Sequence, residues 1–93
     1  MIKTLGLANR ARKILLGTEL VINALPKKQI HLVLLSNEAA SNTSKLVINK
    51  CNYYEVDYLI VDDYQMNQAV GKTNIKVIGI ADQGFSQLLL KKN

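Results

Sequence analysis

Gly71, Lys72 and Thr73 come closest to a catalytic motif in this sequence, because they match the end of a phosphate-binding P-loop. That motif needs an earlier glycine at the position that Met66 occupies. A P-loop also follows a strand and opens a helix, whereas this segment follows a predicted helix and opens a predicted strand. The sequence therefore argues against nucleotide hydrolysis.

Two aspartates, Asp62 and Asp63, follow a predicted buried strand, where a phospho-accepting aspartate or a magnesium ligand can stand. Capping of the next helix by Asp62 is the commoner role, and no acidic cluster at another strand end supports a metal site. His31 and Cys51 are the single histidine and the single cysteine, too few for a structural zinc site or for a nucleophile with its base. We expect a structural histidine, a buried apolar cysteine, no metal, no cofactor and no enzymatic activity.

The remaining chemistry is that of binding, and it centres on two glycines. Gly17 and Thr18 open a predicted helix with Thr18 as its N-cap, and the free N–H groups and positive dipole end there suit an anion. The alternative for each glycine is a simple turn. Lys13 and Arg10 can flank the helix start, Asn23 lies on the polar face of the same helix, and a basic loop offers Gly71, Lys72, Thr73 and Asn74.

Charge is distributed unevenly along the sequence. The 93 residues carry a net charge of +5, and residues 1–28 alone have a net +5 from six basic residues and Glu19. Residues 51–63 contain four acidic residues and no basic one, a net −4. One part of the fold should be basic and another acidic. A basic side suits a nucleic acid, and it equally suits plain solvated lysines.

The elements that must position these residues are helices and strands that alternate along the whole sequence. An unbroken apolar run at residues 32–35 predicts a strand covered on both faces. The helix before it should carry an apolar face of Leu20, Val21, Ala24 and Leu25. The other predicted elements are helices at residues 2–12, 41–54, 63–70 and after residue 82, and strands at residues 14–16, 58–61 and 75–81.

Several predicted helices have recognisable ends and faces. Asp62 and Asp82 should each cap a helix, and Gly71 should end the helix that Asp62 begins. The stripe of the first helix is Ile2, Leu5, Ala8 and Ala11, and the last helix carries Phe85, Leu88 and Leu89, with Lys91 and Lys92 at its negative end.

This order of elements predicts one domain over residues 1–93. The expected fold is of the α/β class, a three-layer α/β/α sandwich with a central mixed, mostly parallel sheet. No apolar run approaches the length that spans a bilayer, and the first residues do not resemble a secretory signal. We therefore expect a cytoplasmic protein that makes no membrane contact.

Six segments, taken together and in order, resemble one protein family. They resemble bacterial members of the ribosomal protein superfamily that binds kink-turn RNA, and the resemblance covers nearly the whole sequence. The segments are L-G-L-A-N-R-A-R-K at residues 5–13, G-T-E-L-V-I-N-A-L at 17–25, H-L-V-L-L-S-N-E-A-A-S-N-T at 31–43, K-C-N-Y-Y-E-V at 50–56, A-V-G-K-T-N at 69–74 and D-Q-G-F at 82–85.

The resemblance implies the three-layer fold and the binding of RNA kink-turns, in which an internal loop with sheared G·A pairs bends the duplex sharply. In that superfamily the helix start after a Gly-Thr pair lies against the bent backbone and exposed guanine edges, and a loop near the last strand covers the flipped-out base. The matching positions here are Gly17 and Thr18, and then the loop that starts at Gly71. RNA is often recognised through such irregular shapes, and nearby lysines or arginines add salt-dependent affinity.

The sequence also departs from the family pattern. Family members typically carry Asn-Glu after Gly-Thr and a lysine that faces guanine further along the helix, whereas this sequence has Glu19, Leu20 and Asn23 there. Asn67 stands where the family has another glycine. The leading hypothesis is a non-enzymatic protein that recognises kink-turn or other bent, structured RNA, such as ribosomal RNA, by shape. The alternative is a protein–protein adaptor, associated with ribosomes or the transcription–translation apparatus, with weak or lost kink-turn affinity, which the acidic residues 55–63 favour.

Overall fold

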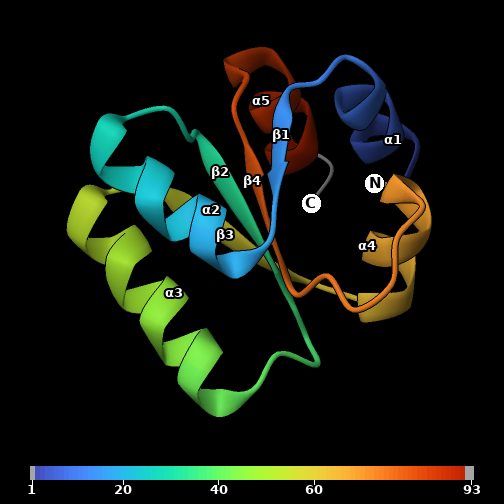
Figure 1. Cartoon of the computed structure of the whole chain (residues 1–93). Coiled ribbons are helices and arrows are strands. Elements are labelled where there is room, and N and C mark those ends of the chain that lie inside the picture. The colour runs from blue at the N-terminus through green and yellow to red at the C-terminus, as the bar shows by residue number, and fades with distance from the viewer. Residues whose placement is uncertain (1, 92–93) are drawn as a thin grey trace.

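The computed structural model describes residues 2–91, which form five α-helices, one short 3₁₀-helix and four strands (Figure 1). None of the helices within these residues is long and apolar enough to cross a membrane. In chain order the elements are α1 (Ile2–Arg10), β1 (Ile14–Leu16), α2 (Thr18–Ala24), η1 (Leu25–Lys27), β2 (Leu32–Ser36), α3 (Ser41–Tyr54), β3 (Asp57–Val61), α4 (Asp63–Val70), β4 (Val77–Ile80) and α5 (Gln83–Lys91).

The four strands form one mixed sheet in the order β1-β4-β2-β3. β2 pairs with β3 in parallel, while β4 runs antiparallel to both of its neighbours, β1 and β2. The prediction of a mixed sheet is confirmed, and three of the four strands share a direction, as a mostly parallel sheet implies. The pairing differs from that expectation, because only one of the three strand pairs is parallel. The reason is that the last strand inserts between β1 and β2 with the opposite direction, and apolar periodicity carries no information on strand direction.

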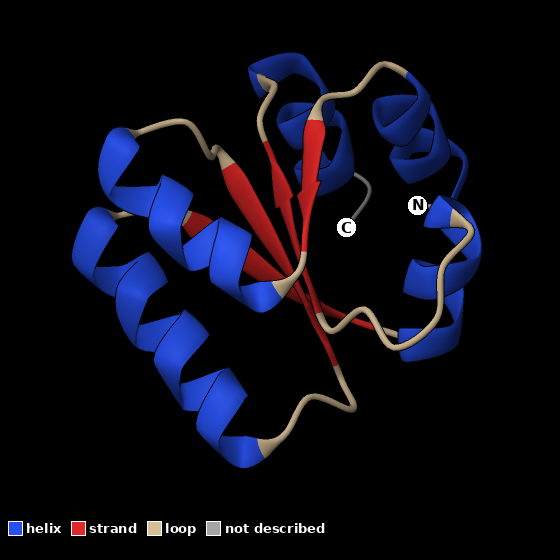
Figure 2. Cartoon of the chain, viewed as in Figure 1, coloured by secondary structure: helices blue, strands red, loops and turns tan. Residues whose placement is uncertain are grey.

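Helices cover both faces of the sheet, which confirms the three-layer α/β/α sandwich (Figure 2). α2 and α3 lie on one face, and α1, α4 and α5 lie on the other. The five residues of β2 are all buried, as its unbroken apolar run predicts. Its side chains alternate between the two layers, so that Leu32 and Leu34 pack in one core while Val33 and Leu35 pack in the other.

The buried faces of three helices differ in part from the predicted ones. Val21 and Ala24 of α2 and Leu25, which begins η1, are buried. Leu20 is 57% exposed, because it lies at the margin of that i, i+3, i+4 stripe. Leu88 is 54% exposed, since α5 turns the side of Ser86 and Leu89 to the sheet. The stripe of α1 is reduced to its middle residues, Leu5 and Ala8, with Ile2 and Ala11 exposed at the ends.

The predicted helix caps are confirmed except at α2, and α1 ends at Arg10, two residues before its predicted end. Asp62 accepts a bond from the backbone N–H of Gln65 (3.0 Å), and Asp82 accepts one from that of Phe85 (2.9 Å). Gly71 ends α4 in the left-handed conformation, with φ of 68°. The prediction that Thr18 is an N-cap is wrong: Thr18 is the first residue of α2, and Gly17 takes the cap position. Lys92 lies outside the described residues.

Cys51 is buried in α3, as expected, and lies in the core between α3 and the sheet. Burial raises the pKa of its thiol to about 11, because the thiolate loses its hydration there. Its thiol is therefore protonated at neutral pH, and Cys51 acts as a small apolar core residue.

Candidate functional site

The ends of four strands meet at one edge of the sheet. β1, β2 and β3 share a direction and β4 opposes it, so the carboxyl ends of three strands lie beside the amino end of the fourth. We call this the carboxyl edge. In Figure 1 it is the lower side of the sheet. Three connections leave from it: Gly17 into α2, residues 37–40 into α3, and Asp62 into α4. A fourth, residues 71–76, returns to it from the end of α4 and enters β4.

Gly17 joins β1 to α2 in a conformation that few other residues adopt. Its φ is 107° and its ψ is 150°, a region that is nearly restricted to glycine. Its N–H donates to the carbonyl oxygen of Val77 (2.9 Å), and its own carbonyl accepts from Val21 as the first bond of the helix. No side chain of the described residues caps α2. The N–H groups of the first turn therefore face the carboxyl edge without a side-chain partner.

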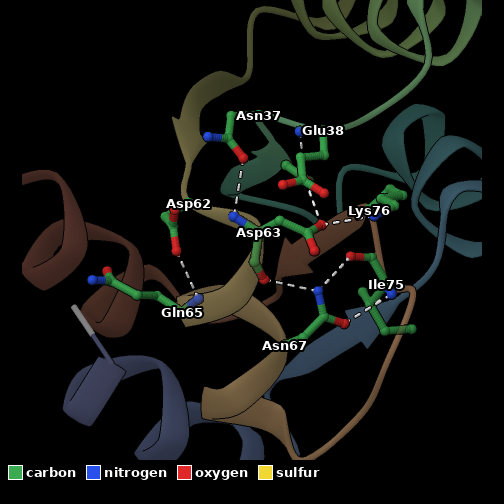
Figure 3. Close-up of polar contacts among 9 residues, drawn as sticks. Asn37, Glu38, Asp62, Asp63, Gln65, Asn67, Ile75 and Lys76 are labelled. Atoms are coloured by element: carbon green, nitrogen blue, oxygen red, sulfur yellow. Dashed lines mark hydrogen bonds and ion pairs between the residues drawn. The ribbon is translucent and has the colours of Figure 1, made fainter.

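The segment at residues 71–76 follows Gly71 across the same edge, and Asn67 fixes its far end (Figure 3). The side-chain amide of Asn67, in α4, bonds the backbone N–H and carbonyl of Ile75 at 2.8 and 3.0 Å. The same Nδ2 also donates to the carbonyl oxygen of Asp63 (2.9 Å). Asn67 is only 8% exposed, so these bonds are sheltered from water. The loop is thus tied to α4 and projects Lys72, Thr73 and Asn74 into solvent.

Asp63 links three of the strand ends through its side chain and backbone. Its Oδ1 accepts from Ser36 Oγ (2.6 Å) and pairs with Lys76 Nζ (2.9 Å), and its N–H donates to Asn37 Oδ1 (3.0 Å). The bonds from Lys76 and then Ser36 hold the pKa of the Asp63 carboxyl below its usual value, because they favour the ionised form. The carboxylate of Asp63 and the ammonium of Lys76 therefore largely neutralise each other.

A cavity of about 390 Å³ opens between α4 and the loop. Its wall combines an aromatic ring, Tyr64, which is 71% exposed, with the carboxylate of Glu38 and the cation of Lys72. Thr73, Asn74, Asn67, Gln68 and Asp63 complete the lining. An exposed ring beside amides and a lysine suits a planar polar group attached to an anion. The sequence analysis missed Tyr64 and Gln68 as lining residues, although residues 63, 64, 67 and 68 follow helical spacing on one face of α4.

The structure brings most of the predicted binding residues together, with one separated from the rest. Gly17 and Thr18 lie at the carboxyl edge, and Asn23 lies exposed on α2. Gly71 ends α4, and the loop that it starts brings Lys72, Thr73 and Asn74 to the cavity that Glu38 and Asp63 also line. Lys13 lies at the opposite edge, because its carbonyl accepts from Ala81 at the other end of β4 (2.7 Å). About 13 Å of extended chain separate Lys13 from Gly17. Arg10 precedes Lys13 at the end of α1.

Acidic and metal-ligating side chains do not gather at this edge into a metal site. Across residues 2–91, no group of three or more His, Cys, Asp or Glu side chains is arranged to hold a metal ion. Asp62 and Asp63, which the sequence placed after a strand, serve as a helix cap and as the partner of Lys76.

Comparison with other sequences identifies one family and two curated relatives. The sequence profile of the Ribosomal protein L7Ae/L30e/S12e/Gadd45 family matches residues 1–90. RNA-binding protein YlxQ of Bacillus subtilis is 45% identical over 87 residues, which cover 92% of this chain and 87% of that protein. RNA-binding protein YlxQ of Enterococcus faecium is 38% identical over 84 residues, which cover 89% of this chain and 81% of that protein.

The solved structures that are similar to this fold include the following two. A protein of unknown function from Bacillus halodurans superposes with a TM-score of 0.92 at 38% identity, over 97% of this chain and 92% of that one. The Giardia lamblia 15.5kD RNA binding protein superposes with a TM-score of 0.83 over 97% of this chain and 78% of that one. Because its identity is 12%, the second similarity concerns the fold alone.

Proposed function

This chain belongs to the Ribosomal protein L7Ae/L30e/S12e/Gadd45 family, and on that premise we propose that it is a non-enzymatic RNA-binding protein. Its ligand is a kink-turn or another sharply bent, structured RNA, which it recognises by shape at the carboxyl edge. The names of the two YlxQ relatives support RNA as the partner. We place this activity in the cytoplasm, on ribosomal or other structured RNA.

The observation that carries the proposal is the bond between Gly17 N–H and the carbonyl of Val77 (2.9 Å). It fixes the open start of α2 beside the segment that enters β4, so that two backbone elements far apart in sequence form one surface. A bent duplex offers such a surface phosphates and exposed base edges together, and unpaired N–H groups at a helix start bind anions. The cavity beside Lys72 and Tyr64 gives this surface room for an unstacked base.

Asn23 is the proposed side-chain contact to a base. It lies exposed on the same polar face of α2 as Glu19, one helical turn from it. An amide can donate and accept at once, which suits the mixed donors and acceptors of a purine edge. Since Asn23 carries no charge, its contact should contribute less affinity than a lysine in the same place.

The charges at the carboxyl edge favour recognition by shape over attraction by charge. Lys76 is paired with Asp63, and Glu19 and Glu38 are exposed at the same edge. Lys72 is the cation that lines the cavity. Arg10 and Lys13, which belong to the basic N-terminal third, lie at the other edge. The salt dependence of binding should therefore be shallow, with few phosphates neutralised.

The direct test is fluorescence anisotropy with a labelled kink-turn RNA across a series of salt concentrations. A duplex of equal length without the kink is the matched control RNA. We expect clear preference for the kinked RNA, and we expect that preference to persist as salt rises because it comes from shape. Equal binding of both RNAs would contradict the proposal, since charge alone would then account for the affinity.

A further inference from the structure

β3 is one of the two outer strands of the sheet, and its long outward side is open. It pairs with β2 on one side, and no strand of the described residues pairs with it on the other. An open edge presents unpaired backbone groups that can pair with another chain. The opposite edge strand, β1, has only three residues, whereas β3 has five.

The register of the sheet identifies which backbone groups face outward. In a parallel pair, alternate residues direct both N–H and carbonyl to the same neighbour. Val61 faces β2, because its carbonyl accepts from the N–H of Asn37 (2.8 Å). Alternation then directs the backbone of Leu59 and Asp57 to β2 and that of Tyr58 and Ile60 to the open side. An added strand can therefore form bonds with two residues of β3.

An apolar side chain stands next to these outward groups. Ile60 is 61% exposed, more than any other leucine or isoleucine of residues 2–91. It shares a face of the sheet with Tyr58, which packs partly against the core under α3. A strand laid along β3 would place one of its own side chains beside Ile60, and such cross-strand pairs stabilise a sheet.

Acidic side chains flank this apolar position on both ends of the strand. Glu55 and Asp57 are exposed at its start, and Asp62 is exposed just beyond its end. Residues 51–63 contain no lysine or arginine. A second copy of this chain would bring its own acidic flanks against these and be repelled. A segment with lysine or arginine on either side of an apolar residue would instead be attracted.

We propose that the outer edge of β3 is a docking site for an extended, basic peptide segment of a partner protein, which adds to the sheet as a fifth strand. Backbone bonds to Tyr58 and Ile60 provide the pairing, and an apolar side chain contacts Ile60. Lysines or arginines at neighbouring positions face Asp57 and Asp62. This surface goes beyond the proposed RNA site and gives the protein a separate place for a protein partner.

The test uses the whole protein, labelled with ¹⁵N, and an acetylated and amidated peptide in which four lysines alternate with three valines. A titration followed by amide NMR signals should show its largest shifts at Tyr58 and Ile60, with slower hydrogen exchange at both. A control peptide replaces the three valines by proline, which keeps the charge but cannot pair as a strand. The control should cause no specific shift at these two amides.

Two protein variants separate strand addition from attraction by charge. Ile60→Lys should weaken peptide binding by about five-fold or more, because the cross-strand contact is lost and a like charge is added. Leu88→Lys changes an exposed leucine of α5 in the same way and should leave binding unchanged. Both variants should bind kink-turn RNA as the unchanged protein does, so failure of this proposal is distinguishable from failure of the RNA proposal.

Three outcomes would overturn the docking site. The first is equal binding of the valine and proline peptides, which would indicate attraction by charge alone. The second is an absence of shifts at Tyr58 and Ile60 at millimolar peptide. The third is an equal loss of binding in Ile60→Lys and Leu88→Lys.

Discussion

The side chain of Asn67 pairs with the backbone of Ile75 as one strand pairs with another. Its Oδ1 accepts from Ile75 N–H (2.8 Å), and its Nδ2 donates to the Ile75 carbonyl (3.0 Å). These two bonds hold Ile75 at the end of the loop, two residues before β4 begins at Val77. They explain why β4 starts later than the apolar pattern from residue 75 predicts.

Removal of this amide should free the loop. Asn67→Ala loses three hydrogen bonds in a sheltered place, so we expect the free energy of unfolding to fall by about 2 kcal/mol. Urea denaturation measures that loss, and hydrogen exchange at the Ile75 amide measures the loosening directly. Gln65→Ala, an exposed change in the same helix, is the control and should leave the Ile75 amide protected. Unchanged exchange in Asn67→Ala would contradict this account.

The Asp63 network predicts how stability depends on pH. The pKa of Asp63 is lowered in the folded protein, so its contribution is present above the ordinary aspartate pKa, near 4, and is lost as pH falls through the folded value. Asp63→Asn lacks that contribution at every pH. The stability gap between the two proteins, measured by urea midpoints, should be largest at pH 7 and shrink toward pH 2. A gap that stays constant would show that Asp63 contributes nothing through its charge.

Gly17 should tolerate substitution poorly although nothing crowds it. Apart from Gly17 and its two chain neighbours, no heavy atom of residues 2–91 lies within 4 Å of the position that a Cβ would take, so the penalty of Gly17→Ala comes from φ of 107°. We expect a loss of about 1–3 kcal/mol in unfolding free energy. Gly71→Asn is the control, because φ of 68° lies in the left-handed region that asparagine tolerates. Its free energy of unfolding should fall by less than that of Gly17→Ala. Equal losses at both glycines would rule out this conformational explanation.

Lys72 and Lys13 provide a matched pair for the RNA site, because each alanine variant removes one charge. Lys72→Ala should weaken binding to the kinked RNA and reduce the slope of log affinity against log salt by about 1. Lys13→Ala should change the slope less, since Lys13 lies at the other edge of the sheet. Anisotropy titrations at several salt concentrations measure both slopes. A larger effect from Lys13 would shift the RNA surface toward α1.

Asn23→Lys tests the base contact on α2. If the Asn23 side chain faces a base, the added charge should raise affinity for the kink-turn RNA by about five-fold or more, because charged hydrogen bonds are stronger than neutral ones. Asn52→Lys adds the same charge on α3 and should raise affinity for kinked and straight RNA alike, and only slightly. No selective gain in Asn23→Lys would place Asn23 away from the RNA.

Much of the fold could be predicted from local signals. The apolar run at residues 32–35, the caps Asp62 and Asp82, and the stop at Gly71 each act within a few residues of themselves, and the structure confirms them. The family resemblance rests on an ordered set of segments across the chain, and it is confirmed by the family profile that matches residues 1–90. Those signals are sufficient for the order of elements and for the three layers.

Features that depend on distant contacts were not predictable in the same way. The direction of β4 and its place between β1 and β2 follow from pairing across the whole chain, which periodicity does not report. Lys13 is near Gly17 in sequence, yet a strand between them carries it to the opposite edge. In the sequence, Asn67 is notable only because it replaces a family glycine. Its hydrogen bonds to Ile75 depend on the conformation of the loop, which the sequence pattern does not report.

The place of β4 in the sheet also determines when the protein can fold during synthesis. A ribosome produces β1, β2 and β3 first, but β1 has no strand to pair with until β4 follows, because Ile14 pairs with Ile80. Pairings so far apart in sequence slow folding. The surface between Gly17 and Val77 likewise comes into existence only at that step. A nascent chain that lacks β4 therefore cannot offer the proposed RNA site, and RNA capture would report that β4 has joined the sheet.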